Sequence, residues 1–124
     1  MNNFNIAIAY VKRVFLEKYL CLEGRANRAE FWYSFLFNFI VTTILGFIPG
    51  KAGMIIQIVW WLAVLLPTLG VAVRRLHDIN KNGWLMLIGL IPLVGEIILI
   101  VWWCKAGDQA ENQYGPVPEE IKAE

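Results

Sequence analysis

The sequence predicts an all-α integral membrane protein: an N-terminal amphipathic interfacial helix, a two-span helical hairpin, and a third hydrophobic helix kinked or broken near its middle. Hydrophobic residues make up 58% of the 124 residues, above the roughly 45–50% of soluble domains. Charged residues make up only 17%. A soluble domain this short could not cover so much apolar surface. The apolar residues also form three long blocks, and about 20 helical residues cross a ~30 Å hydrocarbon core.

The first element, residues 4–22, has the periodicity of an amphipathic helix. Its apolar residues recur at spacings of three and four, and they are Phe4, Ile8, Val11, Phe15, Tyr19 and Leu22. The segment is too polar to span a bilayer, so we expect it to lie in the membrane interface. A helix packed on a soluble partner is the alternative.

Two charge-free stretches, 31–48 and 54–73, each have the length of a transmembrane helix. Because the hydrocarbon core holds no water, the backbone must satisfy its own hydrogen bonds, and a helix does so. The intervening "IPGKAG" has the proline and glycines of a tight turn. The two stretches therefore predict a helical hairpin.

The third apolar run, residues 83–104, is interrupted by Pro92, Gly95 and Glu96. A carboxylate at the bilayer centre costs roughly 2.5–3.5 kcal/mol on insertion scales. One interpretation is a single kinked helix with Glu96 turned toward the protein interior, and the other is a broken, re-entrant element with both ends on one side. Each arm of about ten residues reaches only ~15 Å, which disfavours two full crossings. We prefer the single kinked span, followed by a polar tail over 105–124.

Basic residues near the span ends indicate the orientation. Eight of them lie before the first span or just after the second, namely Lys12, Arg13, Lys18, Arg25, Arg28, Arg74, Arg75 and Lys81, whereas the turn between the spans has Lys51. The positive-inside rule then predicts a multi-pass protein of the bacterial inner membrane with a cytoplasmic N-terminus. A single third crossing would place the tail outside.

Two polar segments, "GRANRAEFW" (24–32) and "RRLHDINKNGW" (74–84), fall at this cytoplasmic interface. Guanidinium groups bind phosphate bidentately, which favours a site for anionic lipid, a phosphate-bearing ligand or a partner protein. The alternative is that these arginines are interface anchors, paired with neighbouring carboxylates. Consecutive helical residues point ~100° apart, so we expect at most one of the two adjacent arginines to aim into the bundle. The candidate ligand-binding residues are Arg25, Arg28, Glu30, Arg74, Arg75, His77 and Asp78.

The sequence predicts no enzyme, metal site or cofactor. His77 lies next to Asp78, but it is the only histidine and no cysteine lies nearby, which disfavours a zinc site. Ser34 is the only serine and lies in no GxSxG motif. A net charge of +1 argues against nucleic acid as a partner. The expected partners are the lipid bilayer, anionic lipids in particular, and a membrane protein or a second copy of the chain.

Polar side chains inside the apolar runs have two interpretations. Asn38 and Gln57 can hydrogen-bond between helices and hold the spans together. Alternatively, an oligomer could form a small transporter or channel with a polar path near Gln57 and Glu96, because interrupted helices mark some transporter sites.

Four motifs, "GRANRAEFW", "RRLHDINKNGW", "IPLVG" and "NQYGPVP", occur in this order between about Cys21 and Pro118. In this order and spacing they resemble the Domain of Unknown Function 805 family of small bacterial inner-membrane proteins. The resemblance implies a helical inner-membrane protein without an assigned reaction or catalytic residues. Glu96 departs from the family pattern, which has an apolar residue after the break.

The resemblance also implies a characteristic residue set spread over three boxes. The set is Gly24, Arg25, Arg28, Glu30, Trp32, Arg74, Arg75, Leu76, His77, Asp78, Gly83, Trp84, Asn112, Tyr114 and Gly115. A single third crossing would separate the tail box from the other two, whereas a third run that turns back would let all three meet.

Overall fold

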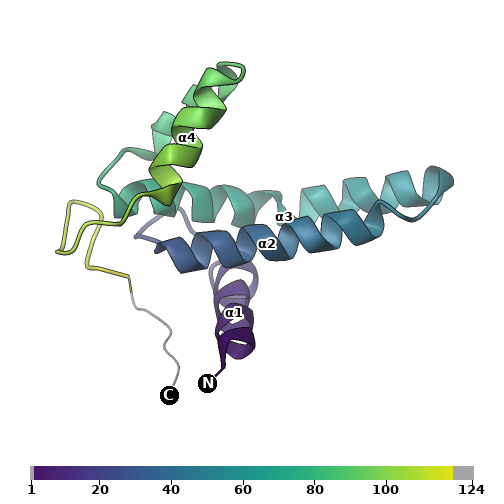
Figure 1. The fold of residues 1–124 in the computed structure, drawn as a ribbon, viewed down its shortest axis with the longest axis horizontal. Coiled ribbons are helices and arrows are strands. Elements are labelled where there is room, and N and C mark those ends of the chain that lie inside the picture. The colour runs from purple at the N-terminus through teal and green to yellow at the C-terminus, as the bar shows by residue number, and fades with distance from the viewer. Residues whose placement is uncertain (1, 119–124) are drawn as a thin grey trace.

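The chain is all-α in a computed structural model that describes residues 2–118 (Figure 1). Its elements are α1 (Asn3–Lys12) with the π-helical turn η1 (Arg13–Glu17), α2 (Arg28–Leu45), α3 (Gly50–Asp78), the 3₁₀ helix η2 (Gly83–Leu90) and α4 (Val94–Cys104). Figure 1 shows α2 and α3 side by side as a long pair, with α1 projecting to one side and α4 to the other. Both projections leave the pair in the half where α3 ends, and this places the polar segments at one end of the molecule.

The α2–α3 pair is the predicted hairpin. Gly50 has φ +74°, a conformation that favours glycine, and a Cβ on Gly53 would lie 1.9 Å from the Ile48 carbonyl oxygen, so the turn needs both glycines. Among residues 2–118, α3 is the one helix long and apolar enough to cross a membrane, with a mean hydropathy of 2.1 over 18 residues. Only 22% of that window is buried, which is unlike the core helix of a soluble domain.

The helix α3 continues into the second polar segment and ends at Asp78, whereas the predicted span ends at Val73. Its 29 residues are about 44 Å long, more than a ~30 Å hydrocarbon core, and its last turn is polar. The helix persists because the chain on either side of it supplies partners for its charged side chains. The positive charge of Arg75 in the last turn also interacts favourably with the negative end of the helix dipole.

The third apolar run is broken, and the preferred single kinked helix is wrong. Leu93 has φ 64°, and the proline before it cannot donate a backbone hydrogen bond, so the helix stops and α4 returns along η2. The ends of the run meet, since the Lys81 ammonium lies 4.8 Å from the Trp102 ring centre. Each arm is about 16 Å long, half of a bilayer core. Glu96 is exposed on the first turn of α4, not turned into the interior.

The N-terminal helix is shorter than the predicted 4–22. Helical structure ends at Glu17, and the chain from 18 to 27 is irregular. Tyr10 and Val14 are buried against the rest of the protein. Much of the predicted apolar face, including Phe4 and Ile8, stays exposed and is available to a membrane interface.

Candidate functional site

Asp78 lies between two arginines at the end of α3. Its carboxylate accepts hydrogen bonds from Arg25 Nε at 2.9 Å and Arg75 Nη1 at 2.8 Å. Both arginine side chains are 0% exposed. Burying charges is costly unless each one is paired and hydrogen-bonded, and Asp78 supplies the countercharge for both.

Arg25 connects the first polar segment to the tail. Its guanidinium donates to the carbonyl oxygens of Asp108 at 2.6 Å, Ala110 at 2.9 Å and Gly115 at 3.2 Å. These bonds fix the tail on the membrane domain and leave Arg25 no free edge for a ligand.

Arg75 holds the C-terminal end of α4. It donates to the carbonyl oxygen of Trp103 at 3.1 Å and to that of Lys105. The last carbonyls of a helix have no partner within the helix, so Arg75 satisfies groups that would otherwise need water.

Arg74 faces the opposite wall and is also buried, so the expectation that at most one of the two adjacent arginines aims into the protein is wrong. Its Nη1 donates to Glu30 Oε1 at 2.7 Å, and Arg13 Nη1 lies 3.8 Å from Glu30 Oε2. Arg74 and Arg75 are both enclosed because α1 and α2 cover one side of the end of α3, while the tail and α4 cover the other side. Within residues 2–118, Arg74 Nε and Nη2 are buried without a hydrogen-bond partner.

The tail box packs on His77. The Tyr114 ring stacks on the imidazole at 4.0 Å between ring centres, and Asn112 Nδ2 donates to the His77 carbonyl oxygen at 3.0 Å. His77 lies in the polar last turn of α3, and burial lowers its pKa below the ordinary value. The ring is therefore neutral at pH 7, and Nδ1 must carry the proton that it donates to the Gly24 carbonyl oxygen at 2.9 Å. All three boxes thus meet at one end of the molecule.

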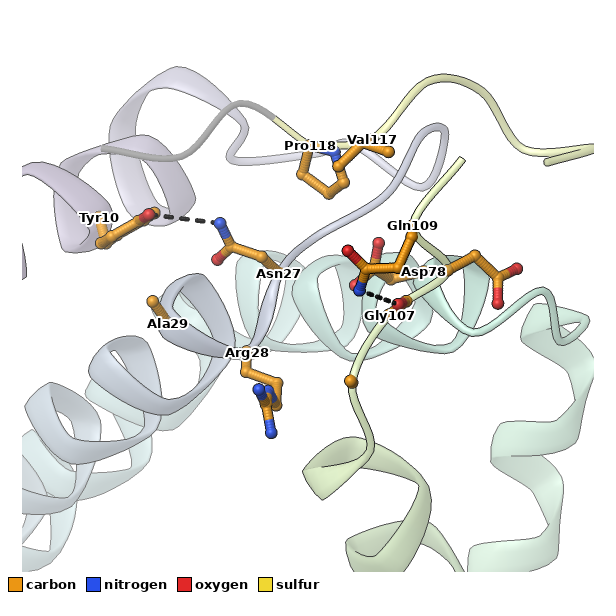
Figure 2. Close-up of a pocket in the computed structure, with 11 residues that line it drawn as sticks. Tyr10, Asn27, Arg28, Ala29, Asp78, Gly107, Gln109, Val117 and Pro118 are labelled. Atoms are coloured by element: carbon orange, nitrogen blue, oxygen red, sulfur yellow. Dashed lines mark hydrogen bonds between the residues drawn. The ribbon is translucent and has the colours of Figure 1, made fainter. Parts of the chain in front are cut away.

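Arg28 differs from the other arginines of the predicted set because it is exposed. Among the described residues it makes one hydrogen bond, from Nη1 to the Cys104 carbonyl oxygen at 3.3 Å. It borders two cavities. One, of about 400 Å³, has a lining that is about half polar and half apolar, and Tyr10, Asn27 and Asp108 are among its polar residues. Figure 2 shows the Arg28 side chain directed away from Val117 and Pro118, which lie on the far side of that cavity.

The second cavity at Arg28, of about 360 Å³, is apolar and runs along α2. Its other lining residues are Ala29, Trp32, Tyr33 and Leu36. Arg28 and Ala29 line both cavities, so the guanidinium stands at a boundary between polar and apolar surroundings.

The predicted intramembrane polar residues are not brought together. Asn38 Oδ1 accepts from Trp60 Nε1 at 2.8 Å, and Gln57 Nε2 donates to the Thr42 carbonyl oxygen at 3.1 Å, both between α2 and α3. Such bonds join helices within a membrane. In the described part of the chain, no hydrogen bond or ion pair links Glu96 to either residue.

Sequence reasoning missed several residues that shape this region. Asn27 caps α2, accepting from the Glu30 backbone N–H at 2.8 Å, and an asparagine three residues before a glutamate is a known signal for a helix start. Gly107 has no such signal. A Cβ there would lie 1.9 Å from Asp78 Oδ2, so glycine is required for the tail to approach. Between residues 2 and 118, no group of three or more potential metal ligands occurs.

Comparison with known proteins gives consistent relatives. Residues 19–116 match the family described as "Protein of unknown function (DUF805)". Inner membrane protein YhaH of Escherichia coli K12 is 38% identical over 111 residues, covering 84% of this chain and 92% of YhaH. Inner membrane protein YhaI of the same strain is 36% identical over 107 residues, covering 84% of this chain and 91% of YhaI. No solved structure matches the chain.

Proposed function

We propose a lipid-binding function for this chain, which belongs to the DUF805 family and is a small inner-membrane protein. In this proposal it binds an anionic phospholipid at Arg28, on the cytoplasmic face of the membrane, and the bound lipid and the assembled boxes present a scaffold to a membrane partner or a second copy. The proposed activity is binding, without catalysis.

The proposal rests on a difference between Arg28 and the other arginines of the predicted set. Arg25 and Arg75 donate their hydrogen bonds to Asp78 and to backbone carbonyls, and Arg74 is enclosed beside Glu30. Arg28 alone of this set is exposed, with one weak internal hydrogen bond among the described residues. Its remaining N–H donors can reach a phosphate in bidentate fashion.

The surroundings of Arg28 suit a molecule that is polar at one end and apolar at the other. A headgroup would face the cavity with the mixed polar and apolar lining, and an acyl chain would follow the apolar cavity past Trp32, Tyr33 and Leu36. Aromatic rings favour this depth of the membrane interface.

The local charge also favours an anion. The salt bridges of the cluster involve four arginines, Arg13, Arg25, Arg74 and Arg75, and two carboxylates, Glu30 and Asp78. Asp108 raises the number of carboxylates to three, so one positive charge remains in excess before Arg28 is counted.

Retention of lipid measured by native mass spectrometry tests the proposal. Protein released from nanodiscs that hold equal parts of phosphatidylglycerol and phosphatidylcholine should carry phosphatidylglycerol, and Arg28→Gln should lower its apparent affinity about tenfold, the equivalent of one charged hydrogen bond. Lys12→Gln is the matched control, since it removes an equal charge from an exposed position on α1 that lines neither cavity. Equal phosphatidylglycerol retention by Arg28→Gln and the wild-type protein would contradict the proposal.

A further inference from the structure

A cavity of about 450 Å³, separate from the two beside Arg28, lies where η2 packs against the last turns of α3. Small-molecule sites commonly have volumes of about 300–1,000 Å³. The lining has no charged side chain and is mostly apolar. Its residues are Leu22 from the chain after η1, Leu69, Val73 and His77 from α3, and Asn82, Gly83, Trp84, Met86 and Leu87 from η2 and the residue that caps it.

His77 is the firmly held polar side chain of this lining. It is only 8% exposed, and its ring stacks on Tyr114 with the two planes 4° apart. Nδ1 donates its proton to the Gly24 carbonyl oxygen. With the proton on Nδ1, Nε2 of the neutral ring is a hydrogen-bond acceptor. The orientation and the tautomer of the ring are therefore fixed by the protein before a ligand arrives.

The Nε2 atom is accessible, and no residue among 2–118 donates a hydrogen bond to it. It lies on the edge of the ring that faces Gly83 and Val73, since a Cβ added at Gly83 would be 3.5 Å from Nε2 and 2.8 Å from Val73 Cγ1. All three residues line the cavity. Because Gly83 has no side chain, the approach to Nε2 stays open. The mostly apolar cavity thus contains a fixed acceptor that lacks a donor.

An unfilled acceptor in apolar surroundings favours a ligand with a hydroxyl group. A polar group kept from water without a partner costs free energy, and an O–H from the ligand restores the missing hydrogen bond. A charged ligand is disfavoured because the lining offers it no countercharge. A phenol combines one O–H donor with a flat apolar ring, and the Trp84 indole and the Met86 thioether are suitable surfaces for such a ring.

We propose that the cavity between α3 and η2 binds a neutral, lipid-soluble phenol, whose hydroxyl donates to His77 Nε2 and whose ring packs on Trp84 and Met86. Apolar substituents on the ring would extend along Leu69. The site shares no lining residue with either cavity beside Arg28, so it is distinct from the proposed anion site.

The test uses the full chain with ¹⁵N-labelled histidine in phosphatidylcholine nanodiscs. His77 is the only histidine, so Nε2 gives a single acceptor resonance. The probe is para-tert-butylphenol, and para-tert-butylanisole is the methyl ether that lacks its O–H. We expect the phenol to move the Nε2 resonance saturably toward that of a protonated nitrogen. The ether should leave Nε2 unshifted and bind about five- to tenfold more weakly, as loss of one hydrogen bond predicts, when concentrations within the bilayer are compared.

Two substitutions test the position of the phenol. Gly83→Ala should weaken its binding at least about fivefold, because the added Cβ narrows the approach to Nε2 and removes access to the hydrogen bond. Gly89→Ala, which adds the same methyl group to η2 outside the cavity, should bind as the wild-type protein does. Leu87 is 56% exposed, so Leu87→Ala should fold normally and weaken the phenol and the ether alike by removing apolar contact that both make.

Three results would overturn the proposal. The first is the absence of a saturable Nε2 shift in the wild-type protein. The second is equal affinity for the phenol and the ether, which is the result for a cavity that only accepts apolar groups such as lipid tails. The third is unchanged phenol affinity in both Gly83→Ala and Leu87→Ala. Arg28→Gln should leave phenol binding unchanged, so failure of the anionic-lipid proposal and failure of this one are distinguishable.

Discussion

Asp78 is the residue on which the assembly of the three boxes depends. It joins Arg25, which holds the tail, to Arg75, which holds the end of α4. Both guanidinium groups are fully buried, so removing the carboxylate would leave two charges without their counterion. This role depends on the position of Asp78 at the end of α3 as well as on its charge.

Asp78→Asn should therefore lower the free energy of unfolding by about 3–5 kcal/mol, the usual cost of breaking a buried ion pair by removal of one partner. Denaturant titration in detergent micelles, followed by tryptophan fluorescence, measures the change. Asp108→Asn is the control, because Asp108 is exposed and its carboxylate accepts from Asn112 alone among the described side chains. A loss no larger than that of the control would show that Asp78 is not the organising residue.

The sequence could predict which residue types gather here, but not how their donors are used. Arginines beside carboxylates at span ends are visible in "GRANRAEFW" and "RRLHDINKNGW". Besides Asp78, the partners of Arg25 and Arg75 include backbone carbonyls between Trp103 and Gly115, which any residue type could provide. The prediction of one shared anion site could not anticipate that these donors are used within the protein.

At the scale of elements, the η2–α4 hairpin shows where hydrophobic length is informative and where it is not. A charge-free stretch of about 20 residues predicts a spanning helix. The first two stretches form the continuous helices α2 and α3, of which α3 is long and apolar enough to cross a membrane. The third run has nearly the same length, yet it doubles back at Pro92 and Leu93. Length cannot separate the two outcomes, because the same number of apolar residues can make one full crossing or two arms of half that length.

Glycine decides whether the two arms of the hairpin can meet. A Cβ at Gly95 would lie 1.8 Å from the Ile88 carbonyl oxygen, which is backbone and cannot move independently. A Cβ at Gly89 would lie 3.2 Å from Leu99 Cδ1, the end of a flexible side chain. The two glycines are therefore a matched pair of sites in one hairpin.

Gly95→Ala should lower the free energy of unfolding by about 1–3 kcal/mol, the usual cost of forcing an extra methyl group into a packed site. Gly89→Ala should have a smaller effect, because Leu99 can shift to another rotamer. Unfolding in detergent measures both. If Gly95→Ala were as stable as the wild-type protein, the close packing of η2 on α4 would be refuted.

At the scale of the whole molecule, the tail and the chain just before α2 lie at the same end, where α3 finishes. Arg25 binds the tail carbonyls and Tyr114 stacks on His77, so residues 108–115 lie against the end of α3. The turn between α2 and α3, with Lys51, is at the opposite end of the pair (Figure 1). If α2 and α3 both cross the membrane, the tail must lie on the same side as the loop before α2.

Cysteine labelling in spheroplasts tests this arrangement. In a Cys21→Ser, Cys104→Ser background, single variants Gln113→Cys, Lys12→Cys and Lys51→Cys place thiols on the tail, on α1 and at the turn, all at exposed positions. We expect a membrane-impermeant maleimide to label Lys51→Cys in intact spheroplasts, and the other two only after the membrane is opened. This pattern follows from the excess of basic residues around the three boxes, which favours the cytoplasmic side.

The two other outcomes separate orientation from fold. Labelling of Lys12→Cys and Gln113→Cys but not Lys51→Cys in intact spheroplasts would keep the three boxes together and reverse the orientation. Labelling of Gln113→Cys together with Lys51→Cys, while Lys12→Cys stays protected, would place the tail across the membrane from α1. Arg25 could not then reach the tail carbonyls, and the third run would have to cross the bilayer once after all.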